Sequence, residues 1–124
     1  MGSRRAELLH RLFALETFGI KLGLDNISRL CAALGHPERA FTTLHVAGTN
    51  GKGSVTAMVH AALVAAGVRA GRYISPHLVD LSERFVIGSG PVDAEALQRA
   101  AEDVLDCADE LKAAGGLPVH PTFF

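Results

Sequence analysis

Three things are scarce in this 124-residue sequence: net charge, long apolar runs and metal-binding spacings. The formal net charge is -1, so bulk electrostatics gives no reason to expect nucleic acid or an anionic membrane as a partner. No apolar run approaches the roughly 20 residues that cross a bilayer, and no signal-peptide core follows the N-terminal arginines. We therefore expect a globular, cytoplasmic protein.

Metal-ligating residues are few or badly spaced. Cys31 and Cys107 lack the C-x-x-C spacing of zinc and redox sites, so we expect buried free thiols. The six histidines form no H-x-x-x-H pattern, which argues against a histidine-built metal site. A run of acidic residues on the last predicted helix could suggest a metal, but is better explained as a solvated face: Glu102, Asp103, Asp106, Asp109 and Glu110.

Apolar periodicity predicts four helices. They are expected at residues 4–17, from Asp25 or Asn26 to Leu34, from Lys52 to Ala66, and from a cap at Asp93 to about residue 114. In the last helix the apolar face is expected to consist of Leu97, Ala101, Val104, Ala108 and Leu111.

Strands are predicted between the helices. Residues 40–47, AFTTLHVA, are typical of a buried strand, and residues 68–75 of a second one. A β-arm with its turn at residues 88–90 follows. This alternation predicts an α/β fold of the P-loop type, with a mainly parallel sheet flanked by helices.

The sequence predicts two regions, a helical segment at residues 1–37 and part of a P-loop ATP-binding domain at residues 38–124. Two or three strands cannot cover both faces of a parallel sheet, and the sequence stops at Phe124 without a closing element. We therefore expect that the domain is incomplete and that the chain is the first part of a longer protein.

The stretch LHVAGTNGKGSV, residues 44–55, carries the chemistry. It departs twice from the P-loop pattern G-x-x-x-x-G-K-[ST]. Val46 stands where the first glycine belongs, and Gly53 separates Lys52 from the hydroxyl of Ser54. The position that normally supplies a magnesium-binding hydroxyl therefore has no side chain.

A glycine-rich turn between a strand and a helix lets backbone N–H groups converge on an anion, aided by the helix N-terminus. Lys52 can reach the outer phosphates, and Asn50 tolerates unusual backbone angles. The alternative is an ordinary turn with a solvated lysine. The G-T-N-G-K context favours binding of nucleotide phosphates.

The motifs VAGTNGKGS (46–54) and YISPHL (73–78) resemble the folylpolyglutamate synthase and dihydrofolate synthase family of the Mur ligase superfamily. The resemblance continues through residues 18–37 and 81–92. It implies that the ATP phosphates are held by Thr49, Asn50, Gly51, Lys52, Gly53 and Ser54, and that Ser75 is a magnesium ligand.

The resemblance also implies the reaction. ATP phosphorylates a carboxylate of a folate or dihydropteroate, and the amine of L-glutamate then displaces phosphate. Lys52 would supply catalytic electrostatic stabilisation. We expect ATP and Mg²⁺ as cofactors and a monomer at full length. Because the remaining magnesium ligands and the glutamate-binding domain of the family are missing, we expect no turnover by the isolated chain.

Several assignments stay open. His77 could order its loop or meet substrate, and Arg84 could meet an anionic pterin–glutamate substrate, although arginines in β-arms are more often solvated. His45 is better explained as a packed strand residue. The alternative function is a non-catalytic nucleotide-binding module or truncated pseudo-enzyme. A generic P-loop kinase is disfavoured by Gly53.

Overall fold

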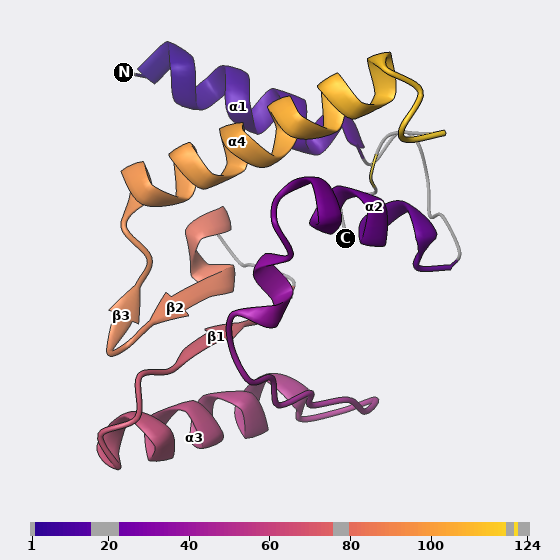
Figure 1. Cartoon of the computed structure of the whole chain (residues 1–124). Coiled ribbons are helices and arrows are strands. Elements are labelled where there is room, and N and C mark those ends of the chain that lie inside the picture. The colour runs from indigo at the N-terminus through magenta and orange to yellow at the C-terminus, as the bar shows by residue number, and fades with distance from the viewer. Residues whose placement is uncertain (1, 16–22, 76–79, 119–120, 122–124) are drawn as a thin grey trace. The chain divides into compact units, whose positions relative to one another are not determined.

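A computed structural model describes residues 2–15, 23–75, 80–118 and 121 of the chain. The chain divides into two compact units (Figure 1). The first consists of Met1–Thr42 together with Gln98–Phe124, and the second of Thr43–Leu97. These units are not the two regions predicted from the sequence, which stay a prediction.

The first unit is helical. It contains α1 (Gly2–Ala14), α2 (Asp25–Ala33), a 3₁₀ turn at Pro37–Arg39, and all but the first turn of α4 (Ala94–Ala113). Two small apolar clusters hold it together. Leu8, Leu15 and Leu105 form the first cluster, and Leu30, Ala108 and Leu117 form the second. Helix α4 contributes to both clusters, so it is the central packing element of this unit.

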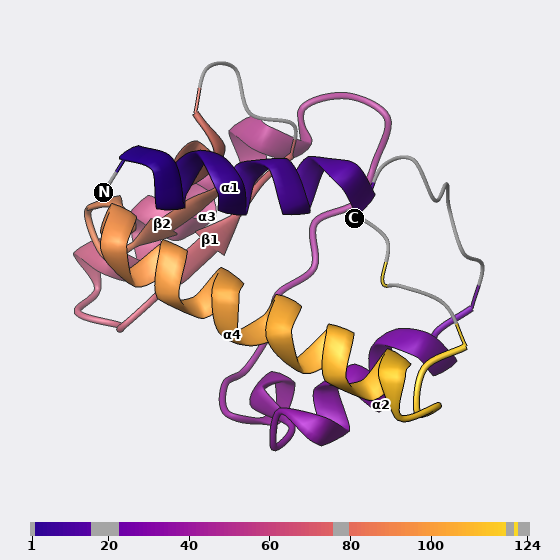
Figure 2. The ribbon, with the colours of Figure 1, turned by 90° about the horizontal axis from the view of Figure 1, so that it is seen from above.

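Helices α1 and α4 lie side by side in both views of the ribbon (Figures 1 and 2). Arg4 donates two hydrogen bonds to the carboxylate of Glu102, at 2.9 and 2.7 Å. These bonds hold the pKa of Glu102 below its usual value. Arg11 contacts Asp106 at 3.0 Å and Asp109 at 2.9 Å. Part of the acidic face of α4 therefore pairs with arginines, and no metal-binding group of three residues occurs in the described part of the chain.

The second unit carries the strands. It contains α3 (Lys52–Ala65), β1 (Gly71–Tyr73), a 3₁₀ turn at Leu81–Arg84, β2 (Phe85–Ile87) and β3 (Gly90–Pro91). The strands pair in the order β1-β2-β3, and both ladders are antiparallel. Gly71 pairs with Ile87 and Tyr73 with Phe85.

A buried histidine connects α3 to the β-arm. His60 is 8 % exposed, and its Nε2 contacts the carbonyl oxygen of Gly88, in the turn between β2 and β3. A carbonyl oxygen can only accept, so Nε2 carries the proton. Nδ1 is buried and has no hydrogen-bond partner among the described residues. The contact holds the turn of the arm against the helix.

The α/β class and the four helices are confirmed. Helix boundaries lie within a few residues of the predicted ones, although residues 16 and 17 of the first predicted helix are outside the described part. The predicted cap of α4 is also confirmed, because the N–H of Ala96 donates to Asp93 Oδ2 at 3.0 Å. No helix in the described part of the chain is long and apolar enough to span a bilayer.

The predicted strand pairing is wrong for the strands that the structure describes. We expected a mainly parallel sheet, but a parallel pair needs a crossover of a dozen or more residues. Only residues 74–84 connect β1 to β2, and only residues 88 and 89 connect β2 to β3. Antiparallel pairing is the arrangement that such short connections permit.

The predicted buried strand at residues 40–47 is also not observed. Residues 42–48 have no regular secondary structure, and Phe41 and Leu44 are 66 % and 67 % exposed. A buried strand requires neighbours on both sides. No strand of the described residues pairs with this segment.

The packed face of α4 provides a test of this fold. Leu105 is 5 % exposed, whereas the neighbouring Val104, which we had placed on the packed face, is 38 % exposed. We expect Leu105→Ala to lower the free energy of unfolding by about 2–5 kcal/mol, because it leaves a cavity. Val104→Ala is the matched control and should change it by less than about 1 kcal/mol. Chemical denaturation of both variants measures the difference, and equal losses would contradict the observed face.

Candidate functional site

The glycine-rich loop leads directly into α3. Gly51 occupies the position before the helix with φ +74°, in the left-handed region that favours glycine. No side chain caps this helix start. As in every α-helix, the first N–H groups have no intrahelical partner. The first intrahelical bond is the one that the N–H of Val55 donates to the Gly51 carbonyl oxygen, at 3.0 Å. Such a helix start can accept an anion.

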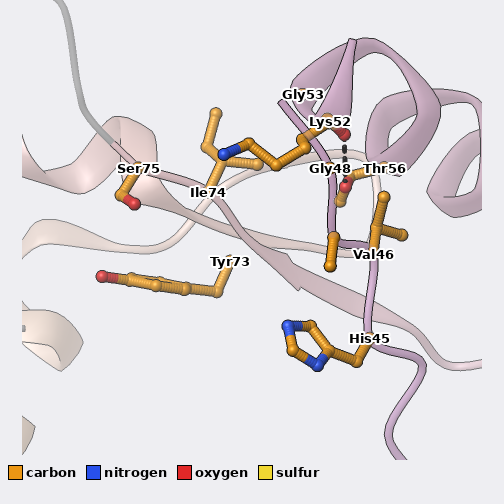
Figure 3. Close-up of a pocket in the computed structure, with 10 residues that line it drawn as sticks. His45, Val46, Gly48, Lys52, Gly53, Thr56, Tyr73, Ile74 and Ser75 are labelled. Carbon is orange, nitrogen blue, oxygen red and sulfur yellow. Dashed lines mark hydrogen bonds between the residues drawn. The ribbon is translucent and has the colours of Figure 1, made fainter. Parts of the chain in front are cut away.

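A pocket of about 470 Å³ lies beside this helix start, within the second unit (Figure 3). Its volume falls in the range of small-molecule sites. Three segments line it: residues 45–48 before the turn, three residues of α3, and residues 73–75, which are the last residue of β1 and the two that follow it. The residues from α3 are Lys52, Gly53 and Thr56, and those of the third segment are Tyr73, Ile74 and Ser75.

Lys52 and Ser75 line the same pocket from different elements. Figure 3 shows the ammonium group of Lys52 extending from α3 towards Ile74 and Ser75. The N–H of Ile74 donates to the carbonyl oxygen of Arg84 at 2.9 Å, which continues the pairing of β1 with the chain before β2. Ser75 therefore directly follows an anchored residue. Positive charge and a hydroxyl group border one cavity, as phosphate binding would require.

Arg84 does not line the pocket, but it contacts Tyr73, which does. It is only 6 % exposed, and its Nη1 is 3.4 Å from the hydroxyl oxygen of Tyr73. The rings of Tyr73 and Phe85 pack with centroids 5.3 Å apart. The expectation of a solvated arginine is wrong, because Arg84 is buried. A direct contact of Arg84 with substrate stays a prediction.

The structure brings together part of the predicted phosphate site. Lys52, Gly53 and Ser75 line the pocket. Four other predicted phosphate-site residues are exposed but do not line it: Thr49, Asn50, Gly51 and Ser54. His77 lies outside the described residues.

Seven pocket residues were not assigned to the site from the sequence: His45, Val46, Ala47, Gly48, Thr56, Tyr73 and Ile74. Thr56 lies four residues after Lys52 and therefore on the same helix face, and this spacing could have revealed it. Tyr73 lies two residues before Ser75, which is the corresponding spacing for a strand. His45 was expected to be a packed strand residue, but it is exposed, lies outside any strand and lines the pocket.

The donor atoms of this pocket fit a magnesium ion only in part. Magnesium prefers oxygen ligands and commonly keeps several waters, with phosphates completing its shell. Ser75 and Thr56 supply hydroxyl oxygens, and no carboxylate is among the lining residues. These residues fit a hydrated ion that is bound together with nucleotide phosphates. They do not form an all-protein cage.

Comparison with solved structures defines the class of protein. The chain superimposes on folylpolyglutamate synthase from Thermotoga maritima with a TM-score of 0.80 and 36% identity, covering 97% of this chain and 28% of that one. The Mycobacterium tuberculosis folylpolyglutamate synthase, solved with ADP and AMPPCP, gives a TM-score of 0.75 and 32% identity, covering 98% and 27%. These neighbours are ATP-dependent ligases.

The curated relatives define the family more closely. The dihydrofolate synthase/folylpolyglutamate synthase of Bacillus subtilis is 42% identical over 78 residues, which are 63% of this chain and 18% of that protein. No family model matches the chain. The resemblance to the folylpolyglutamate and dihydrofolate synthase family is confirmed, and the chain corresponds to a part of such proteins. It spans less than a third of the length of these relatives.

The two glycines that flank Lys52 provide a test of the loop geometry. A Cβ at Gly51 or at Gly53 would meet no atom within 4 Å, but only Gly51 has a positive φ. We expect Gly51→Ala to cost about 1–2 kcal/mol of folding stability through backbone strain. Gly53→Ala should be neutral or slightly stabilising, because alanine favours a helix. Thermal unfolding of both variants measures this, and equal effects would contradict the left-handed turn.

Proposed function

We propose that the protein to which this chain belongs is an ATP-dependent ligase that adds L-glutamate to a carboxylate of a folate or dihydropteroate. The observation that supports this most directly is the shared pocket of Lys52 and Ser75 beside an uncapped helix start. The matched relatives act in the same chemistry by name. This function is compatible with a cytoplasmic monomer, as the sequence predicts.

The proposed reaction has two steps. A substrate carboxylate oxygen attacks the γ-phosphorus of ATP, which releases ADP and forms an acyl phosphate. The amine of L-glutamate then attacks the acyl carbon, the amine loses a proton, and inorganic phosphate leaves as the amide forms. No covalent attachment to the protein is required.

The chain's own residues would serve the phosphate side of this reaction. The Lys52 ammonium can offset the negative charge where carboxylate and phosphate approach each other. The free N–H groups of the first turn of α3 can bind phosphate oxygens. Ser75 and the phosphates would hold Mg²⁺, which would supply charge neutralisation when bound.

The alternative is a nucleotide-binding module without ligase activity. The absence of a carboxylate among the pocket-lining residues favours it, because a magnesium-dependent ligase commonly holds the ion with at least one. Glutamate-dependent release of ADP by the complete gene product distinguishes the two functions. ATP binding without such release would support the module.

Removing the lysine tests the proposed charge. In the complete gene product we expect Lys52→Ala to lower ATP-dependent ligation at least about 100-fold. Among the described residues that line the pocket, Lys52 is the only lysine or arginine, so the variant removes the positive charge that would stabilise the reacting phosphate. Lys112→Ala, in the last turn of α4, is the matched control and should retain activity. Unchanged turnover of the Lys52 variant would refute the assignment.

Removing the serine hydroxyl tests the metal assignment. We expect Ser75→Ala to raise the magnesium concentration that gives half-maximal activity about three- to tenfold, as the loss of one oxygen ligand or its hydrogen bond would. Titration of activity with MgCl₂ at saturating ATP measures this. A titration identical to that of the wild type would remove Ser75 from the metal site.

A further inference from the structure

The pocket contains a second hydroxyl group, that of Thr56, to which the proposed function gives no role. Thr56 is half-buried and lines the pocket one helical turn after Lys52. Its Oγ1 donates a hydrogen bond to the carbonyl oxygen of Lys52 at 2.7 Å (Figure 3). Ser54, the hydroxyl residue nearest to Lys52 in the sequence, does not line the pocket.

The hydrogen bond of Thr56 determines what its oxygen can bind. A hydroxyl group has one proton and two lone pairs, and a carbonyl oxygen can only accept. The proton of Thr56 is therefore committed to Lys52, and the hydroxyl oxygen can act towards the pocket only as an acceptor. An acceptor does not suit an anionic phosphate oxygen. It suits a donor, such as a water molecule bound to a metal ion.

Among the described residues that line the pocket, no group donates a hydrogen bond to the hydroxyl oxygen of Thr56. The ammonium group of Lys52 extends away from Thr56, towards Ile74 and Ser75 (Figure 3). The bond to Lys52 also restricts the rotation of the Thr56 side chain, so the acceptor is held in place. Magnesium commonly keeps several of its waters in protein sites, and these waters donate strongly.

We propose that Thr56 accepts a hydrogen bond from a water molecule of the magnesium ion that accompanies the nucleotide. Thr56 is thus a positioning residue, acting through the hydrated ion, and it supplies a hydroxyl that Gly53 cannot. This inference rests on the proposed nucleotide site, and it concerns how the chain distinguishes a magnesium-bound nucleotide from a free one.

The test compares ADP binding with and without magnesium in the complete gene product, by isothermal titration calorimetry. Thr56→Val removes the hydroxyl group and keeps the β-branched shape. In MgCl₂ we expect this variant to bind ADP about three- to tenfold more weakly than the wild type, as the loss of one hydrogen bond predicts. In EDTA we expect the affinities of variant and wild type to be equal. Thr56→Ser retains the hydroxyl and should restore magnesium-dependent binding.

Two further variants make the test decisive. Thr56→Ala is a second hydroxyl-free variant with a higher helix propensity, and it should reproduce the loss seen with valine. Thr43→Val makes the same exchange at an exposed threonine that does not line the pocket, and it should bind ADP as the wild type does. Unfolding midpoints within about 3 °C of the wild type exclude a general loss of stability.

Three results would overturn the inference. Equal ADP affinity of Thr56→Val and the wild type in MgCl₂ would show that the hydroxyl has no role. Equal weakening in MgCl₂ and in EDTA would show that Thr56 acts by shaping the first turn of α3. If the wild type bound ADP neither in MgCl₂ nor in EDTA, the proposed nucleotide site itself would be refuted, and the role of Thr56 with it.

Discussion

The pairing of β1 with the chain that returns towards β2 is the interaction on which the site depends. The ladder joins Tyr73 to Phe85, and the bond from the Ile74 N–H to the Arg84 carbonyl extends it by one step. Ser75 comes next in the chain and lines the pocket with Lys52. Helix α3 is held in the same unit through the contact of His60 with Gly88. Strand pairing and this side-chain contact thus hold in one unit Lys52 and Ser75, which lie more than twenty residues apart in the sequence.

The loop lacks a hydroxyl directly after its lysine, and the pocket beside it is lined by two others. With Gly53 after the lysine, the first turn of α3 carries its charge on Lys52 and has no side-chain cap, but it also has no hydroxyl at the usual position. The two hydroxyl groups that line the pocket are those of Ser75, two residues after β1, and Thr56, one turn further along the helix. Both are neutral, so an ion held there would depend on nucleotide phosphates for its negative ligands.

Sequence reasoning succeeded where the signal is local. Helix boundaries follow from apolar spacing and from residues such as Asp93, whose carboxylate caps α4 as predicted. It failed where burial or strand pairing depends on contacts with segments that are distant in the sequence. Val104 and Leu105 are both apolar, and only the packing of α4 against α1 selects Leu105. The run at residues 40–47 has strand composition, yet a strand forms only with a partner, and the described strands provide none.

The sequence by itself determined the family resemblance and the glycine-rich loop before α3, which depend on residue types and spacing along one segment at a time. The expected magnesium role of Ser75 is what that resemblance implies, and it stays a prediction. Only the tertiary structure showed that Arg84 is buried and contacts the Tyr73 hydroxyl, and that Thr56 lines the pocket with its proton committed to Lys52. Burial and the direction of a hydrogen bond depend on surrounding atoms, and those are set by how distant segments pack.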